Sequence, residues 1–291
     1  MPDLRGRREW DKILKPSENL GDKPNTVKPI EWFSAVDDPR HKQSEREQVM
    51  HTGQKINLVF GICLLPILLL SPLAYKADMI DLMASLGGVM LSVAGGALNL
   101  VGLLVLLVFF KIKNLSVSRG AAIVAALCSI LPIVVMAPHI SSARAVPPIH
   151  DITTNPMDPP MFHEAVKRRI YAANDLAFGD AEHTPDQMEA LHETFYPYLE
   201  TKVVTLEPTA ALARAEAVLR DMGLEIINVS ESLGVVEATD TTFWFGFKDD
   251  VVVRVRSESD RSIIDVRSVS RVGQSDLGVN AARIKTFLDA F

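Results

Sequence analysis

The chain has 291 residues and a formal net charge of −6, and 48% of its residues are hydrophobic. The acidic excess lies in residues 147–291, which argues against nucleic-acid binding, because that function requires a basic surface. Both cysteines, Cys63 and Cys128, lie in apolar segments, so the C-terminal half offers no disulfide, cysteine-ligated metal or thiol nucleophile. We expect no metal and no cofactor.

Residues 1–55 mix Pro, Asp, Lys and Asn with few apolar groups, a composition typical of a largely disordered arm. Two short apolar groups interrupt the arm, Trp10–Leu14 and Ile30–Phe33. They are interpreted either as docking motifs for a cytoplasmic partner or as contacts with the membrane interface, where tryptophan is favoured.

Three apolar segments follow, and none of them contains a charged side chain: residues 56–75, 82–110 and 120–140. A helix needs about 20 apolar residues to cross the hydrocarbon core. The sequence therefore predicts a bundle of three transmembrane helices, embedded in a lipid bilayer.

Basic residues are distributed unevenly around these segments. Close to the predicted helices, the side that holds the N-terminal arm and the second loop carries Arg40, Lys42, Arg46, Lys55, Lys111, Lys113 and Arg119. On the other side, Lys76 is the basic residue of the first loop, and Arg144 follows the third segment. The positive-inside rule then predicts a cytoplasmic N-terminus and places residues 141–291 across the membrane. In a bacterium, this arrangement corresponds to the inner membrane and a periplasmic C-terminal domain.

The second segment carries small residues at a spacing of four: Ala84, Gly88, Ser92 and Gly96. Such a stripe lets helix backbones approach closely in a membrane. It favours packing within the bundle, and the alternative is a homodimer or an interface with another membrane protein.

A connector with five prolines is predicted over residues 141–160, and a soluble domain over 161–291. Residues 161–170 read as a short helix with Phe162, Val166 and Ile170 on one face. Thr184 and Gln187 form a capping box that opens a helix to about residue 195. A strand at 203–206 and a helix at 209–222 follow, then strands at 225–230, 234–239, 251–256 and 262–269, and a last helix from about 275. This order predicts an α+β fold, with one antiparallel sheet and helices on one face.

Three segments resemble the signature of a known family: residues 245–252, residues 266–284 and the proline-flanked residues 150–154. They are similar to motifs of the domain-of-unknown-function family 1499, and the resemblance covers about residues 147–291. The motif residues are Asp249, Asp250, Asp276, Asn280 and Arg283. The resemblance implies a bacterial, often membrane-anchored protein without an established activity.

The arginines of the last two predicted strands form the densest cationic group in the domain. Together with a helix start, where amide groups favour anions, they could hold a phosphate or carboxylate. The residues of this candidate anion site are Arg254, Arg267, Ser270, Arg271 and Ser275. The alternative is structural, with each arginine paired to a nearby aspartate and Ser275 or Asp276 capping the helix.

Two functions therefore stay open. The first is a membrane protein whose soluble domain binds a protein partner or an anionic ligand. The second is an envelope enzyme, resembling a hydrolase, that uses the Arg- and Asp-rich C-terminal motif. The sequence contains no Gly-x-Ser-x-Gly elbow and no nucleotide-binding loop, which favours the first function.

Overall fold

The structure is a computed structural model that describes residues 50–179 and 182–291. These residues belong to one of two compact units of the chain, Val49–Phe291. The predictions for residues 1–49, including the apolar groups Trp10–Leu14 and Ile30–Phe33, lie outside the described residues.

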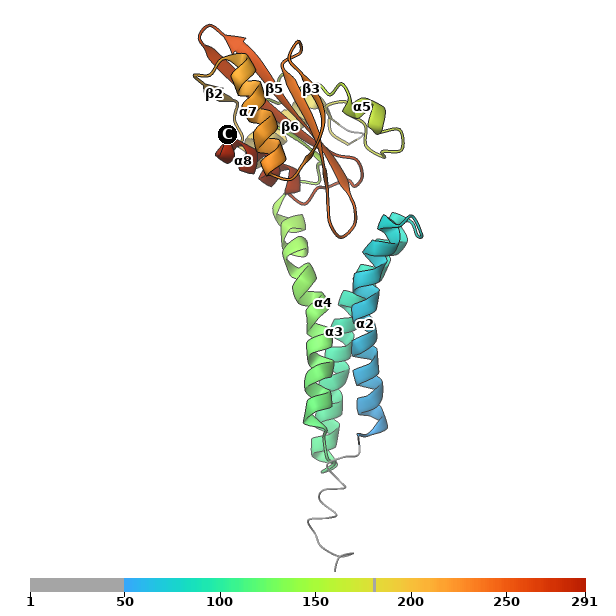
Figure 1. Cartoon of the computed structure of the whole chain (residues 1–291). Helices are drawn as coiled ribbons and strands as arrows, with labels where there is room; N and C mark the ends of the chain where they lie inside the picture. Colours follow the sequence, from blue (N-terminus) through green and yellow to red (C-terminus); the bar gives the residue numbers. More distant parts are fainter. Residues whose placement is uncertain (1–49, 180–181) are drawn as a thin grey trace, which may run out of the picture. The chain divides into compact units, whose positions relative to one another are not determined.

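Three helices are long and apolar enough to cross a membrane: α2 (Thr52–Lys76), α3 (Leu82–Ile112) and α4 (Arg119–Ala145) (Figure 1). They contain the three predicted segments, so the chain is a membrane protein. The helices α2 and α4 extend beyond their apolar segments at both ends, and α3 extends beyond its segment at its C-terminal end. At the start of α3, Asp81 caps the helix by accepting a hydrogen bond from Ala84 N at 2.8 Å. With 31 residues, α3 is about 46 Å long and exceeds a hydrocarbon core of roughly 30 Å.

Neutral polar side chains join the three helices. Asn57 of α2 donates a hydrogen bond to Asn99 Oδ1 of α3 at 2.6 Å. Asn99 in turn donates to Ser129 Oγ of α4 at 2.9 Å. All three side chains are buried, so their polar groups pair with one another instead of facing lipid.

The small-residue stripe of α3 contacts its neighbours in the bundle. A Cβ atom at Gly88 would collide with Ser71 of α2, and one at Gly96 would collide with the carbonyl of Ser129 in α4. Ser92 is fully buried, whereas Ala84 is exposed. Close approach of α3 to α2 and α4 thus depends on the two glycines.

The C-terminal domain contains one antiparallel sheet of six strands, in the order β1-β6-β5-β4-β3, with β2 also paired to β6. Its strands are β1 (Asp151–Thr153), β2 (Lys202–Val204), β3 (Glu225–Ser230), β4 (Val235–Thr241), β5 (Lys248–Glu258) and β6 (Arg261–Ser270). Its helices are α5 (Ala165–Arg168), α6 (Pro185–Phe195), α7 (Pro208–Asp221) and α8 (Val279–Ala290). The predicted α+β arrangement is confirmed, and the predicted connector is divided, because part of it forms strand β1.

The main hydrophobic core lies between one face of the sheet and the helices α6, α7 and α8. Alternate residues of the strands, such as Val253 and Val266, pack there against Leu219 and Ile284. Figure 1 shows α7 and α8 beside this face of the sheet. The opposite face is covered by residues between β1 and α6, which form a second, smaller core around Phe162.

The short helix predicted over residues 161–170 is reduced to α5, four residues long. Phe162 is buried, but Val166 and Ile170 are exposed, so the expected apolar face does not form. The carboxylate of Glu237 in β4 accepts hydrogen bonds from the backbone N–H of Glu164 and Ala165 at 2.9 Å, at the start of α5. These bonds attach the segment to the sheet through its backbone, and not through the apolar face that the sequence predicts.

Candidate functional site

The sheet face opposite the main core carries most of the domain's buried charge, and we call it the charged face. Strand alternation places Asp250, Arg254, Asp265, Arg267 and Arg271 on it, because side chains alternate between the two faces. Arg254 lies directly opposite Asp265 in the β5–β6 register. Three groups of ion pairs result.

The first group joins Arg267 of β6 to Asp151 of β1. Arg267 donates through Nε and Nη2 to the two carboxylate oxygens of Asp151, at 2.9 and 2.6 Å. Both side chains are 3% exposed. Two backbone carbonyls accept the remaining donors of the guanidinium, and Phe162 and Phe178 place their rings 5.5 Å from it. This arginine is therefore satisfied within the domain.

The second group surrounds Asp250 of β5, which is fully buried. Arg169 donates to it at 2.7 Å, Arg271 donates through two atoms at 2.9 and 2.8 Å, and Thr239 donates at 2.7 Å. Burial alone would raise the pKa of Asp250, but hydrogen bonds from Arg271, Thr239 and Arg169 hold it below its ordinary value. Two guanidinium groups share one carboxylate, so this group has an excess positive charge.

The second group reaches the surface through Arg271, whose side chain is 15% exposed. Its Nη1 donates to the backbone carbonyl of Arg168 at 3.1 Å. The Arg168 side chain is 43% exposed and lies 3.3 Å from Glu225. Arg271 thus links the buried Asp250 to the surface, and the Arg168 guanidinium beside it is paired with Glu225.

The third group surrounds Asp265 of β6. Arg254 and Arg256 donate to its Oδ2 at 2.8 and 2.7 Å, and Thr201 donates to Oδ1 at 2.6 Å. The exposed Asp158 approaches both arginines, at 3.0 and 3.7 Å. Here two carboxylates balance two guanidinium groups.

The other face of the sheet holds most of the family motif residues. Arg283 of α8 donates to Asp249 at 2.7 Å and also contacts Asn280, while Asp276 accepts from Asn280 N at 2.7 Å. Burial raises the pKa of Asp276, and its bonds from Gly278 and Asn280 oppose this effect. Asp250 lies on the charged face, so the adjacent aspartates point to opposite sides of β5.

The five residues predicted as an anion site do not converge on one point. Arg254, Arg267 and Arg271 belong to the three separate groups, and Ser270 accepts a hydrogen bond from Asn280 on the opposite face. Ser275 accepts from the backbone N–H of Leu277 at 3.2 Å and lies in the turn before α8. Anion binding stays a prediction, and Arg271 is the predicted residue whose group has an excess of positive charge.

Sequence reasoning missed Arg169 and Asp151 as members of these groups, and it missed Glu237 as the buried carboxylate that binds the backbone of residues 164 and 165. Arg169 pairs with a carboxylate 81 positions away, and Asp151 pairs with an arginine 116 positions away. No local spacing indicates such partners. For Glu237, one local pattern was available. Side-chain alternation along β4 places this residue on the same sheet face as Val235 and Thr239.

A buried histidine, His192 of α6, lies at the β1 edge of the sheet. Its Nε2 accepts a hydrogen bond from Thr153 N at 3.1 Å, and Nδ1 lies 2.7 Å from the carbonyl of Met188. This arrangement fits the neutral tautomer with the proton on Nδ1. Burial lowers the pKa of His192 below its ordinary value. The arrangement is that of a structural residue in the core.

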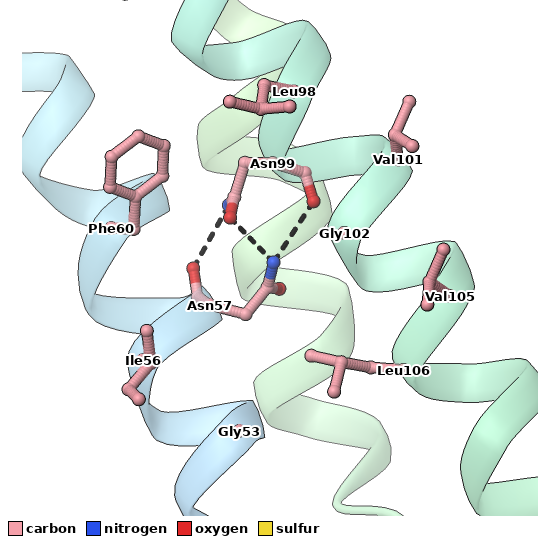
Figure 2. A pocket seen from close by; sticks show the side chains of 10 residues that line it. All are labelled: Gly53, Ile56, Asn57, Phe60, Leu98, Asn99, Val101, Gly102, Val105 and Leu106. Carbon is pink, nitrogen blue, oxygen red and sulfur yellow. Dashed lines mark hydrogen bonds between the residues drawn. The ribbon is translucent and has the colours of Figure 1, made fainter.

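The membrane bundle has a groove of about 540 Å³ between α2 and α3 (Figure 2). The rim is apolar and includes Ile56, Val101 and Val105, while Asn57 and Asn99 lie at its base. Among the described residues, Asn57 Oδ1 has no hydrogen-bond partner. The groove holds no ionisable side chain.

In a comparison with known families, the model of a family described as "Protein of unknown function (DUF1499)" matches residues 151–291. The match begins at β1 and ends at the last residue, so it covers the whole six-stranded sheet and its helices. A comparison with curated proteins gives no match.

Proposed function

We propose that this membrane protein, whose C-terminal domain belongs to the DUF1499 family, uses that domain to bind an anionic ligand or an acidic group of a protein partner. The supporting observation is the group around Asp250, where Arg169 and Arg271 share one buried carboxylate. The unbalanced positive charge favours an anion beside Arg271, at the exposed edge of the charged face.

Binding is favoured over the hydrolase alternative by the state of the carboxylates. Asp250 accepts hydrogen bonds from Arg169 and Arg271, and such bonds stabilise the ionised form. A general acid or base needs a pKa near the working pH, whereas the pKa of Asp250 is lowered. This aspartate therefore suits a rigid support for a binding site.

We further propose that the domain lies on the periplasmic side of a bacterial inner membrane. The support is the distribution of basic residues that flank the membrane helices, with seven next to the helices on the side of the arm and second loop against two next to them on the other side. A membrane-impermeant maleimide should label Ser232→Cys, in the turn before β4, in cells with a permeabilised outer membrane. Labelling only after inner-membrane lysis would contradict this orientation. A homo-oligomer through α3 and a cytoplasmic partner of the arm stay predictions.

The binding proposal is tested by thermal unfolding of the full chain in detergent with inorganic phosphate, glycerol phosphate or succinate. A ligand at 100 times its Kd stabilises a protein by about 2.7 kcal/mol. We expect one of these anions to raise the Tm of the wild type but not of Arg271→Gln.

The matched control is Arg256→Gln, since Arg256 is also a partly exposed arginine paired to a buried aspartate, but in the balanced group. This variant should keep the stabilisation. Equal responses of the two variants, or no response of the wild type to any of the three anions, would contradict an anion site at Arg271.

A further inference from the structure

The loop between β4 and β5 is unusually rich in aromatic residues. Within six residues it contains Phe243, Trp244, Phe245 and Phe247. Phe243 is 88% exposed, and the other three are partly buried. A soluble surface rarely exposes adjoining aromatic rings without a partner for them. We call residues 243–247 the aromatic loop.

The aromatic loop is held in one shape by its own contacts. Phe247 N donates to Thr242 Oγ1 at 2.8 Å, and Thr242 N donates to the Phe247 carbonyl at 2.8 Å. Gly246 adopts a positive φ of 72°, which a side chain would strain. Phe245 and Phe247 stack at 4.7 Å, and Trp244 contacts Phe245 at 5.5 Å. The loop therefore presents its aromatic rings as a rigid unit.

The sheet register places the aromatic loop at the end of the domain that is attached to the membrane. Asp151 of β1 lies opposite Val269, Val269 lies opposite Asp250, and Asp250 lies opposite Thr239, just before the loop. Residues 146–150 join α4 to β1, and five residues span at most about 18 Å. The chain connection thus keeps this end of the sheet near the bilayer surface.

The aromatic loop also contacts the end of a membrane helix. Lys76, the last residue of α2, donates to the Phe243 carbonyl at 2.9 Å. Trp244 Nε1 donates to the Leu69 carbonyl at 3.4 Å, and Tyr75 and Phe247 place their rings 5.8 Å apart. Lys76 ends the apolar stretch of α2, so these contacts put the loop at the depth where hydrocarbon gives way to head groups.

We propose that the aromatic loop inserts into the interfacial region of the bilayer that holds the protein's own helices. One side of the loop packs against α2, and the exposed ring of Phe243 enters the lipid. Aromatic rings are favoured at this depth because they combine an apolar body with polar edges or tips. Together with the short connection after α4, this second attachment fixes the orientation of the domain on the membrane. The anion site at Arg271 is not needed for it.

The test places a fluorescent reporter at Phe243 in the full chain. The chain has three tryptophans, at positions 10, 32 and 244, and replacing them with phenylalanine gives a background without tryptophan. Phe243→Trp is then added, and the protein is incorporated into nanodiscs. We expect lipids brominated near the ester linkage to quench most of the emission, and aqueous iodide to quench little.

The matched control is Leu233→Trp in the same background. Leu233 is 53% exposed and lies before β4, at the opposite end of the strand that leads to the loop. Its emission should be quenched by iodide and not by brominated lipid. A tryptophan at 243 that behaves like the one at 233 would overturn the proposal. Emission shielded from both quenchers would also overturn it, since the ring would then be packed against protein.

Discussion

The membrane bundle and the C-terminal domain bury polar groups in different ways. The bundle joins its helices through neutral groups, Asn57, Asn99 and Ser129. The domain joins its segments through charged pairs such as Arg267 with Asp151. The free-energy cost of an unpaired group explains the difference. In the hydrocarbon core an unpaired charge cannot be solvated by water, and its cost is larger than that of an unpaired amide.

The buried hydrogen bonds of the bundle and the buried ion pairs of the domain both connect segments that are distant in the sequence. The amides connect α2 to α3 and α4, and the ion pairs connect β1 and the segment before α6 to the central strands. A buried pair fixes register, because a slip of one residue would move a charge to the opposite face. The comparison therefore predicts large effects for ionic pairs, moderate effects for neutral ones, and pH sensitivity in the domain.

The largest effect is expected for Arg267→Leu. It leaves the carboxyl group of Asp151 buried without its partner, and breaking a buried pair in this way costs about 3–5 kcal/mol. The double variant Arg267→Leu with Asp151→Leu should recover much of this loss, because replacing both charges with apolar groups is often nearly neutral. Urea unfolding of the full chain in detergent gives both values. Equal stability of the single variant and the wild type would contradict a structural role for the pair.

Arg261→Leu is the control for this first experiment. Arg261 is 60% exposed and its nitrogen lies 3.9 Å from Asp260, so the pair is largely in solvent. Exposed pairs contribute about 0–1 kcal/mol. A loss as large as that of Arg267→Leu would mean that removing any arginine destabilises the domain.

A second effect, of about 1.5–3 kcal/mol, is expected for Glu237→Gln. Glu237 is fully buried and accepts from two backbone N–H groups and from Asn228 Nδ2. In the variant, the amide –NH₂ group takes the place of one carboxylate oxygen, so a hydrogen-bond donor then faces N–H groups that are also donors. Glu225→Gln changes an exposed carboxylate and should have little effect. Thermal unfolding of the two variants side by side measures the difference.

The sequence identifies the membrane segments and the sheet because both follow from local periodicity. Uninterrupted apolar runs predicted α2, α3 and α4, and the alternating apolar pattern predicted the strands at 251–256 and 262–269. The partners of the arginines could not be predicted in this way. The structural alternative in the sequence pairs Arg267 with an aspartate nearby in the chain. Its partner is instead Asp151, in the predicted connector, because strand pairing brings β1 next to β6.

The bundle is tested by Asn99→Leu, with an expected loss of about 1 kcal/mol. This change removes the hydrogen bonds that the Asn99 side chain makes with Asn57 and Ser129, while Asn57 keeps its bond to the backbone carbonyl of residue 99. Ser92→Ala is the matched control, since buried Ser92 bonds only to Gly88 of its own helix. Unfolding of the helical signal in a detergent titration separates the two. Equal losses would show that burial of a polar group, and not the link between helices, determines stability.

The smallest expected effect is a change of pH dependence at His192. Its pKa is lowered by burial, with smaller influences of Met188, Asp151 and Arg267, so the folded state favours the neutral ring. The neutral ring contributes to the free energy of unfolding, and this contribution is complete above pH 6.5, the ordinary pKa of histidine in the unfolded chain. It is lost as the pH falls from 6.5 toward the lower pKa of the folded state, because in this range the unfolded chain binds the proton and the folded chain does not. The Tm of the wild type should therefore drop between pH 7 and 5, and His192→Gln, which keeps an acceptor for Thr153 N, should flatten this drop. His163→Gln alters an exposed histidine and should keep the wild-type profile; a parallel profile for His192→Gln would assign the drop to other groups.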